Sequence, residues 1–490
     1  MQSAARGHLQ AVPKWGIALP RPVVSLFAVA LCTSVAMGLA VRLVDIASVP
    51  PWHSDEGLWA MPPRDFVLFS RWTLGSYYHH YLSPLFTGLL TLEFWVLGPG
   101  IVQARILNAF AGVLTAIGVG LLGRRLGSPT AGALAALALA VDGPSIITSR
   151  SVLLESLQGL LLVGLACQAV GTGRWRRPGL ALLIGLAALT KLLSLYAVAP
   201  ITLYSLWKRG WRGALLDGLW LSAGVLLAGS VFGVIALADW DNFGSVWRWE
   251  FTTRTMGRAM GMLGSEGSLR DTAIYFLTRS PVLLLALLCA SILALIRRWL
   301  TNAASFVGLW VVVGAAVMTV QGYSPQRYYV PLIPLTWLLV FLVLRDAPPR
   351  GALTDWGPRL ACVLLLVHTL FSLTSLFGYY YVLERRDESP AALAQWVDQN
   401  VRPGERVLGP FNLVVSTRAQ ALGLESVSKR GPLTPADLDA LGVAYVIVRH
   451  DTGPDPLSSN LKIEEDNQDR YRLVAQFRDI RVYRISHSQD

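Results

Sequence analysis

The chain has 490 residues, of which 53% are hydrophobic and only 15% are charged. A composition this apolar excludes a large soluble enzyme and indicates a membrane protein with many spans. The formal net charge of +11 does not indicate nucleic-acid binding, because the basic residues form short runs between apolar segments, as cytoplasmic anchors do. Each of the four cysteines lies inside an apolar segment, which favours neither a disulfide framework nor a metal site.

The first apolar segment, 23–44, follows a basic N-terminal stretch. A span needs roughly 20 apolar residues, so we expect a retained first helix and not a cleaved signal peptide. Further apolar segments follow in chain order: 82–98, 102–122, 130–148, 151–170, 178–207, 214–238, 280–296, 303–320, 328–345 and 358–382. Basic runs lie between many of them, and the positive-inside rule places these runs and the N-terminus in the cytoplasm. We therefore expect about eleven transmembrane helices, with the N-terminus inside and the C-terminus outside.

Two apolar segments do not read as ordinary single spans. Segment 82–98 is short, contains Glu93 and follows an aromatic and histidine run. It is therefore predicted to lie on the outer face, or to dip into the membrane, within a first external loop of about 45–101. Segment 178–207 has basic residues at both ends, but it is too short for two spans of roughly 20 residues each. We expect two shortened helices, or a re-entrant hairpin, with an apex near Thr190-Lys191, because interrupted helices at membrane depth line cavities.

Charged and turn-forming residues replace the apolar segments towards the C-terminus. Short strands are predicted at 406–408, 444–448 and 481–485, and helices at 390–399 and 436–441. The predicted fold is therefore a polytopic α-helical membrane domain over 1–383, followed by a small extracytoplasmic α/β domain over 384–490.

Two adjacent acids, Asp55 and Glu56, lie just beyond the first span, between Trp52 and Trp59. Ionised groups close to hydrocarbon are costly and usually mark a functional site. The alternative is a solvated turn with the two tryptophans as interfacial anchors.

The expected topology brings further polar residues to the outer ends of the spans. They are Arg105, Asp142, Arg150, Glu155, Lys191, Arg327 and Tyr328. Basic residues outside the membrane break the positive-inside rule, so they need another purpose. Arginine and lysine hold phosphate oxygens by charge-assisted hydrogen bonds, which favours a negatively charged ligand.

Each of these residues also has a purely structural explanation. Arg105 and Arg150 could extend to lipid headgroups, and Glu155 could pair with either of them inside the bundle. Asp142 precedes Gly-Pro and could end one helix and start another. Arg327, beside two tyrosines, could be a cation–π anchor at the interface.

The order of the motifs along residues 40–345 resembles the GT-C integral-membrane glycosyltransferases. The similarity is to the branch with the protein O-mannosyltransferases and the bacterial lipid A aminoarabinose transferases. The matching motifs are Ser54-Asp55-Glu56-Gly57, Ala104-Arg105-Ile106-Leu107, Gly123 to Leu126, Ser149-Arg150 with Glu155, Gly185 to Lys191, and Arg327-Tyr328 before Pro331 to Pro334. The chain departs from the pattern where Gly57-Leu58 precede Trp59, because in the family an aromatic residue often follows the acidic pair closely.

The resemblance implies transfer of a sugar from a polyprenyl-phosphate donor to an acceptor (a protein, a lipid or a glycan) on the extracytoplasmic face, and we expect a bacterial plasma membrane. Inverting transfer needs a base for the acceptor hydroxyl and cations for the departing phosphate. No metal is required, although a divalent ion is compatible with this chemistry.

The expected roles follow from this chemistry. Asp55 is the base, Glu56 supports the acceptor site and Asp142 places the acceptor or the sugar. Arg105, Lys191, Arg327 and Tyr328 bind the donor phosphate, with Arg150 and Glu155 as a supporting pair. The competing reading is a lipid or polysaccharide transporter or flippase, which would more often show internal repeats with paired broken segments.

Overall fold

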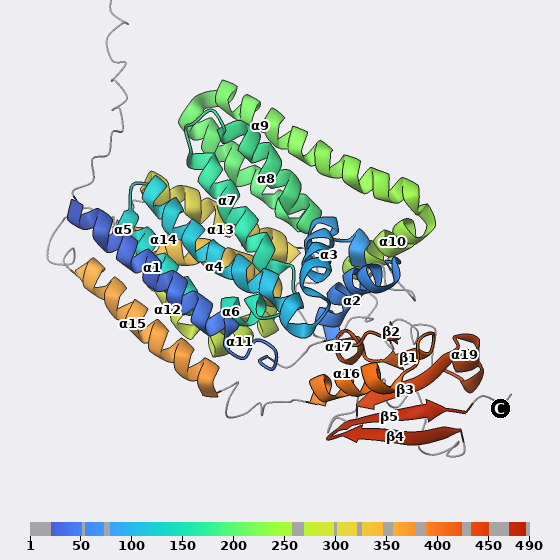
Figure 1. Ribbon diagram of the computed structural model, residues 1–490. Helices are drawn as coiled ribbons and strands as arrows, with labels where there is room; N and C mark the ends of the chain where they lie inside the picture. Colours follow the sequence, from blue (N-terminus) through green and yellow to red (C-terminus); the bar gives the residue numbers. More distant parts are fainter. Residues whose placement is uncertain are drawn as a thin grey trace, which may run out of the picture.

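The helices form one long bundle, and a small β-sheet packs at the end of the bundle where α2 lies (Figure 1). The computed structural model describes residues 21–50, 54–72, 79–256, 269–297, 301–320, 326–345, 356–378, 389–423, 433–449 and 470–486. The helices of the bundle are α1 (Arg21–Leu43), α2 (Ser54–Phe69), η1 (His79–Tyr81), α3 (Pro84–Leu97), α4 (Ile101–Arg125), α5 (Pro129–Ala140), α6 (Gly143–Ser149), α7 (Glu155–Val170), α8 (Arg176–Thr190), η2 (Leu192–Ala197), α9 (Val198–Ala238), α10 (Trp240–Met256), α11 (Leu269–Arg279), α12 (Pro281–Arg297), α13 (Asn302–Val320), η3 (Gln326–Leu332), α14 (Ile333–Arg345) and α15 (Trp356–Phe377).

The apolar helices make this an integral membrane protein. Within the described residues, six helices are long and apolar enough to cross a membrane, or up to eight if each sharply bent helix pair counts as one span. This count is lower than the eleven transmembrane helices expected. Part of the difference lies in helix length, because α7 has 16 residues and a full span needs roughly 20. Helix α3, which was not expected to cross, has 14 residues.

Several expected spans are bent or broken. Segment 130–148 forms two helices, α5 and α6, at 62° to each other, and α11 meets α12 at 104°. Helix α8 ends at Thr190, beside the expected apex, and η2 follows before α9. Helix α9 kinks at Gly210, whose φ of 68° suits glycine, between the apolar segments that the sequence separates. The sequence did not indicate the helices α2, α10 and α11.

Glycines let neighbouring helices approach closely in the bundle. A Cβ atom on Gly123 of α4 would lie 2.3 Å from the Cα atom of Gly132 of α5. A Cβ atom on Gly224 of α9 would lie 2.1 Å from the carbonyl oxygen of Ala181 of α8. Small residues are enriched at such crossings in membranes, because van der Waals packing must hold the helices together there.

The C-terminal residues form a mixed five-stranded sheet with the strand order β2-β1-β3-β5-β4. Its strands are β1 (Arg406–Gly409), β2 (Gln420–Gly423), β3 (Val443–Arg449), β4 (Tyr471–Phe477) and β5 (Ile480–Ile485). The helices are α16 (Ser389–Asn400), α17 (Phe411–Val414) and α19 (Pro435–Ala440). Strand β1 pairs in parallel with β2 and β3, whereas β5 pairs antiparallel with β3 and β4. The strands expected at 406–408, 444–448 and 481–485 coincide with β1, β3 and β5.

The C-terminal sheet is joined to the bundle through α2. Arg64 of α2 is fully buried, and its guanidinium donates hydrogen bonds to the carbonyl oxygens of Thr417 and Ala419, at 2.6 Å each. Another nitrogen of the same guanidinium pairs with Asp65 at 2.6 Å. Helix α2, which carries the acidic pair in its first turn, is therefore fixed to the C-terminal sheet through Arg64, a residue near the middle of the helix.

Candidate active site

The acidic pair occupies the first turn of α2, where carboxylates are favourable because the helix dipole is positive at its N-terminus. Successive residues of an α-helix point about 100° apart. The two carboxylates consequently face different surroundings. Asp55 faces a partly exposed group of charges, whereas Glu56 is completely buried.

Asp55 belongs to a cluster of charged side chains drawn from separate elements. Arg327 of η3 forms an ion pair with Asp55, and its Nε atom lies 3.8 Å from a carboxylate oxygen of Glu155 at the start of α7. Lys191, between α8 and η2, donates to the same oxygen of Glu155 at 2.8 Å. The Nζ atom of Lys191 also lies 3.2 Å from the ring centroid of Tyr328. The structure thus brings together five of the nine residues that the sequence singled out.

This cluster, Asp55, Glu155, Lys191, Arg327 and Tyr328, is graded in exposure. The side chains of Asp55 and Arg327 are 27% and 28% exposed, whereas those of Lys191 and Glu155 are 9% and 3% exposed. Asp55 and Arg327 are therefore accessible to a substrate, and Lys191 and Glu155 lie behind them. Cations in such a partly desolvated setting interact strongly with an incoming anion.

Glu56 and Arg105 form a separate, fully buried ion pair. Two nitrogens of Arg105 bond the two oxygens of Glu56 at 2.9 and 2.8 Å. Arg105 also donates to the carbonyl of Ile46 at 2.8 Å, and the amide of Val152 donates to Glu56 at 2.9 Å. These contacts fix the first turn of α2 to α4 and to the α6–α7 connection. Neither side chain reaches the surface, so the structure places Glu56, expected at the acceptor, and Arg105, expected at the phosphate, against each other and apart from Asp55.

Arg150 satisfies backbone groups at the end of α1. Its guanidinium donates to the carbonyls of Val41, Val44 and Val49 at 2.6, 2.6 and 2.9 Å. A cation at a helix C-terminus is favoured by the helix dipole. The expected pairing of Arg150 with Glu155 is not formed, because Glu155 binds Lys191 and Arg327 instead.

Asp142 lies in the buried core as the N-cap of α6. One of its oxygens accepts a hydrogen bond from the amide of Ser145 at 3.0 Å. The other accepts from Ser280 at 3.2 Å and from the indole of Trp337 at 3.3 Å. The side chain is completely buried. Asp142 thus makes the contact of the helix-stop reading, and its expected contact with an acceptor or a sugar is not part of the arrangement seen here.

Sequence reasoning also missed a buried arginine near this site. Arg42 of α1 donates to the carbonyls of Ala140 and Leu139, at the end of α5, at 2.9 and 3.2 Å. Its position at the end of an apolar segment resembled an ordinary flanking base, so no signal in the sequence marked it. Within the described residues, no group of three or more His, Cys, Asp or Glu side chains is placed to hold a metal ion.

Comparison with solved structures places this arrangement in a known fold. ArnT from Cupriavidus metallidurans, solved bound to undecaprenyl phosphate, matches with a TM-score of 0.67 and 17% identity over 96% of this chain and 99% of that one. Its apo form matches with a TM-score of 0.62 and 15% identity over 94% and 98%. The oligosaccharyltransferase of Archaeoglobus fulgidus in its apo form matches with a TM-score of 0.59 and 12% identity over 86% and 69%.

The chain has the GT-C fold. The resemblance drawn from the order of the sequence motifs is confirmed at this level. No family model and no curated protein sequence matches the chain. The match to the GT-C fold therefore comes from the arrangement of the helices and not from similarity along the sequence.

Proposed function

We propose that this protein is a membrane glycosyltransferase that moves a sugar from a polyprenyl-phosphate donor to an acceptor on the extracytoplasmic face. The observation that carries the proposal is the convergence of Asp55, Arg327, Glu155, Lys191 and Tyr328 from separate elements. The GT-C fold supports it, and so does the undecaprenyl phosphate bound to ArnT, a protein of similar fold.

The basic runs between the spans support an orientation with the N-terminus inside. The membrane domain would then end near residue 383, and the domain from 384 onwards would lie outside.

The transfer needs one base and a site for the leaving phosphate. The acceptor hydroxyl attacks the anomeric carbon, the bond from that carbon to the phosphate oxygen breaks, and polyprenyl phosphate leaves with the electron pair. Asp55 accepts the proton of the hydroxyl. Because phosphate leaves without protonation at neutral pH, one carboxylate suffices, unlike the two that a glycosidase uses.

The paired state of Asp55 gives the donor a second role. In the structure Arg327 neutralises Asp55, and a carboxylate held by a guanidinium is a weaker base. A donor phosphate would compete for Arg327 and draw it away from Asp55. Donor binding would thereby release the base, while Arg327 and Lys191 stabilise the charge on the leaving group.

Tyr328 and Glu155 are assigned to the positioning of the cations, and no residue of the cluster is assigned to the choice of the sugar. Tyr328 is buried, and its ring lies against the ammonium of Lys191, so it positions this cation beside the expected phosphate. Glu155 holds Lys191 and approaches Arg327 from the buried side, so it orients the cations and does not contact the sugar in this proposal. No divalent ion is assigned a step.

The proposal is tested by transfer from a radiolabelled pool of polyprenyl-phosphate-linked sugars in membranes that contain the full-length protein. Asp55→Asn should reduce transfer by about 10²- to 10⁴-fold, the usual contribution of a general base. Asp241→Asn is the matched control, because Asp241 is an exposed aspartate in the first turn of α10. Equal transfer by Asp55→Asn and wild type, at equal abundance, would show that Asp55 is not the base.

The cations are tested in the same assay. Arg327→Gln and Lys191→Gln should each lower transfer by about 10²- to 10³-fold, as loss of one charge-stabilising donor does in other enzymes. If the wild-type protein consumes no lipid-linked sugar from a broad donor panel, the transferase proposal fails and transport becomes the better reading.

A further inference from the structure

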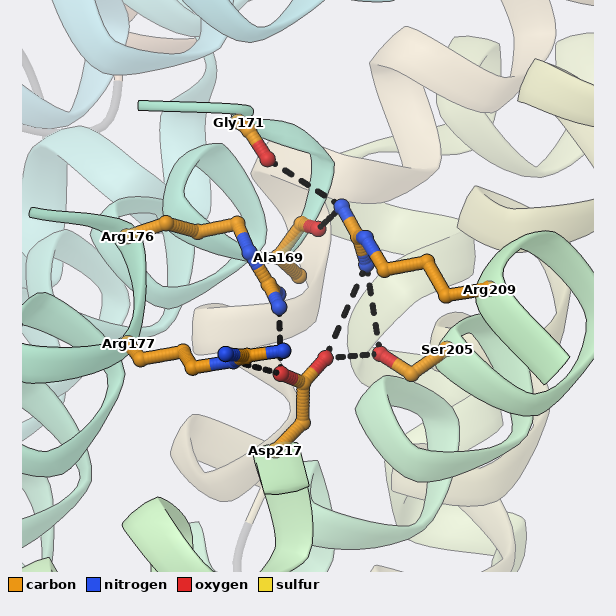
Figure 2. A network of polar contacts seen from close by, with 7 residues as sticks. All are labelled: Ala169, Gly171, Arg176, Arg177, Ser205, Arg209 and Asp217. Carbon is orange, nitrogen blue, oxygen red and sulfur yellow. Dashed lines mark hydrogen bonds and ion pairs between the residues drawn. The ribbon is translucent and has the colours of Figure 1, made fainter. Parts of the chain in front are cut away.

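A second charged cluster lies at the bend of α9, towards the end of the bundle away from α2 and the C-terminal sheet (Figure 1). Figure 2 shows Arg176, Arg177 and Arg209 arranged around the carboxylate of Asp217. Arg176 forms an ion pair with Asp217, and Arg177 and Arg209 lie 3.1 and 3.7 Å from its oxygens. Ser205 donates to the same carboxylate at 2.5 Å.

The cluster carries more positive than negative charge. Three guanidinium groups around one carboxylate leave a formal charge of +2. Arg176 is 6% exposed, and its Nη1 atom is buried with no hydrogen-bond partner in the part of the chain that the structure describes. A buried charged donor without an acceptor is costly. The site therefore favours an additional anion.

A cavity of about 840 Å³ adjoins this cluster. Arg176 lines it, together with Arg125 at the end of α4 and Lys208 of α9. Neither Arg125 nor Lys208 belongs to the Asp217 cluster, so they add two further cations to the wall. Aromatic and aliphatic side chains, among them Trp175 and Tyr204, also line the cavity, and Gln168, Thr172 and Asn302 add polar side chains. The cavity thus offers both a cationic and an apolar wall.

The same end of the bundle carries the features of a membrane interface. Trp175, Trp207 and Trp211 are all more than half exposed, and a neighbouring cation lies over each indole ring. Exposed tryptophans paired with basic residues are typical of the level of the lipid headgroups. The cavity therefore opens at the depth where lipid phosphates lie.

We propose that this cavity binds the phosphate headgroup of an anionic membrane phospholipid. The phosphate would accept hydrogen bonds from Arg176, Arg125 and Lys208, and the glycerol and first acyl carbons would lie against the apolar wall. A free phosphate ion shares the chemistry, but it would fill only a small part of a cavity of about 840 Å³. The lining residues come from the ends of α4, α7, α8 and α13 and from the part of α9 before its kink, so a bound lipid would tie these helices together. The inference does not depend on the transferase activity.

The test is binding of phosphatidylglycerol to the purified full-length protein, by native mass spectrometry and by the shift in melting temperature on titration. Phosphatidylcholine is the comparison, because it has the same phosphate group but a quaternary ammonium makes its net charge zero. Arg125→Gln/Lys208→Gln should weaken phosphatidylglycerol binding about tenfold or more. Arg124→Gln/Arg212→Gln removes the same charge from the same end of the bundle but outside the cavity. It should change binding by no more than about threefold, because neither arginine lines the cavity and salt screens charges that are not in contact with the phosphate.

Three outcomes would overturn the proposal. Equal weakening in both double variants would indicate general surface attraction. Equal stabilisation by phosphatidylcholine would show that the cavity does not recognise the net negative charge of the headgroup. Equal stabilisation by inorganic phosphate or glycerol 3-phosphate would assign the site to a water-soluble anion. All of these readouts are independent of sugar transfer, so failure here leaves the proposed activity untouched.

Discussion

At the residue scale, two adjacent carboxylates in the first turn of α2 have opposite surroundings. Asp55 is partly exposed and pairs with a partly exposed arginine, whereas Glu56 and Arg105 are both completely buried. A buried ion pair contributes little net stability, but removal of one partner leaves an uncompensated charge in the interior. The two acids should therefore respond differently to the loss of their charge.

Glu56→Gln should destabilise the protein by about 3–5 kcal/mol, because Arg105 would stay buried opposite a neutral group. Asp55→Asn should melt close to wild type while losing transfer. The measurement is the melting temperature and transfer rate of both variants, purified in the same detergent. A Glu56→Gln protein that melts like wild type and is nevertheless inactive would show that Glu56 takes part in the transfer reaction.

At the scale of the elements, the contact between α8 and α9 depends on the absence of a side chain. Gly224→Ala should lower the stability by about 1–3 kcal/mol, because the added carbon would lie 2.1 Å from the carbonyl oxygen of Ala181. Gly229→Ala, on the same helix with nothing within 4 Å, should be neutral or stabilise by up to about 1 kcal/mol. Thermal melts of the two variants decide this. Equal melting temperatures of the two variants would show that α8 and α9 move apart to accept the added methyl group without loss of stability.

The junction of α9 with α10 should respond to pH. Tyr81 donates a hydrogen bond to Asp239, and Asn242 donates at 3.1 and 3.0 Å. These bonds favour the ionised carboxylate and hold the pKa of Asp239 below its usual 3.8. Because the pKa is depressed in the folded state, the stabilisation is present above pH 3.8 and is lost as the pH falls through the folded value.

The comparison of wild type with Asp239→Asn isolates this contribution. The difference in melting temperature should be constant near neutral pH and should shrink as the pH falls below about 4. The pKa of His80 is lowered to about 4 by burial, although the charge of Asp239 raises it, so any interaction of the two side chains belongs to the same difference. A difference that does not change down to pH 3 would contradict the assignment.

At the scale of the whole molecule, the C-terminal sheet is connected to the helix that carries Asp55. The link is Arg64, which donates to Thr417 and Ala419 across more than 350 residues of sequence. Helix α17 of the C-terminal residues also packs on α2. The sheet therefore helps to set the position of α2, and with it the position of the first turn.

Arg64→Met should lower both stability and transfer, because buried carbonyl oxygens would lose their donors at about 1–3 kcal/mol each. Arg71→Met is the control, since Arg71 is exposed just beyond the end of α2. Melting temperature and transfer rate are measured together. Full transfer by Arg64→Met would show that α2 keeps its position without the sheet.

The sequence by itself determined the class of fold, the break near Lys191 and most of the charged cluster. Apolar runs, basic flanks and short alternating strands are local patterns, and local patterns are readable without coordinates. The tertiary structure decided which of the nine residues meet. Four of them make buried contacts outside the cluster, namely Glu56, Arg105, Arg150 and Asp142. The other five lie in one cluster, namely Asp55, Glu155, Lys191, Arg327 and Tyr328.

The 104° bend between α11 and α12 and the fixing of α2 to the C-terminal sheet were likewise not visible in the chain. The physical reason is that the partner of a buried charge is set by packing between elements far apart in sequence. An arginine at the end of an apolar segment has the same local pattern whether it caps a helix, pairs with a glutamate or faces a substrate.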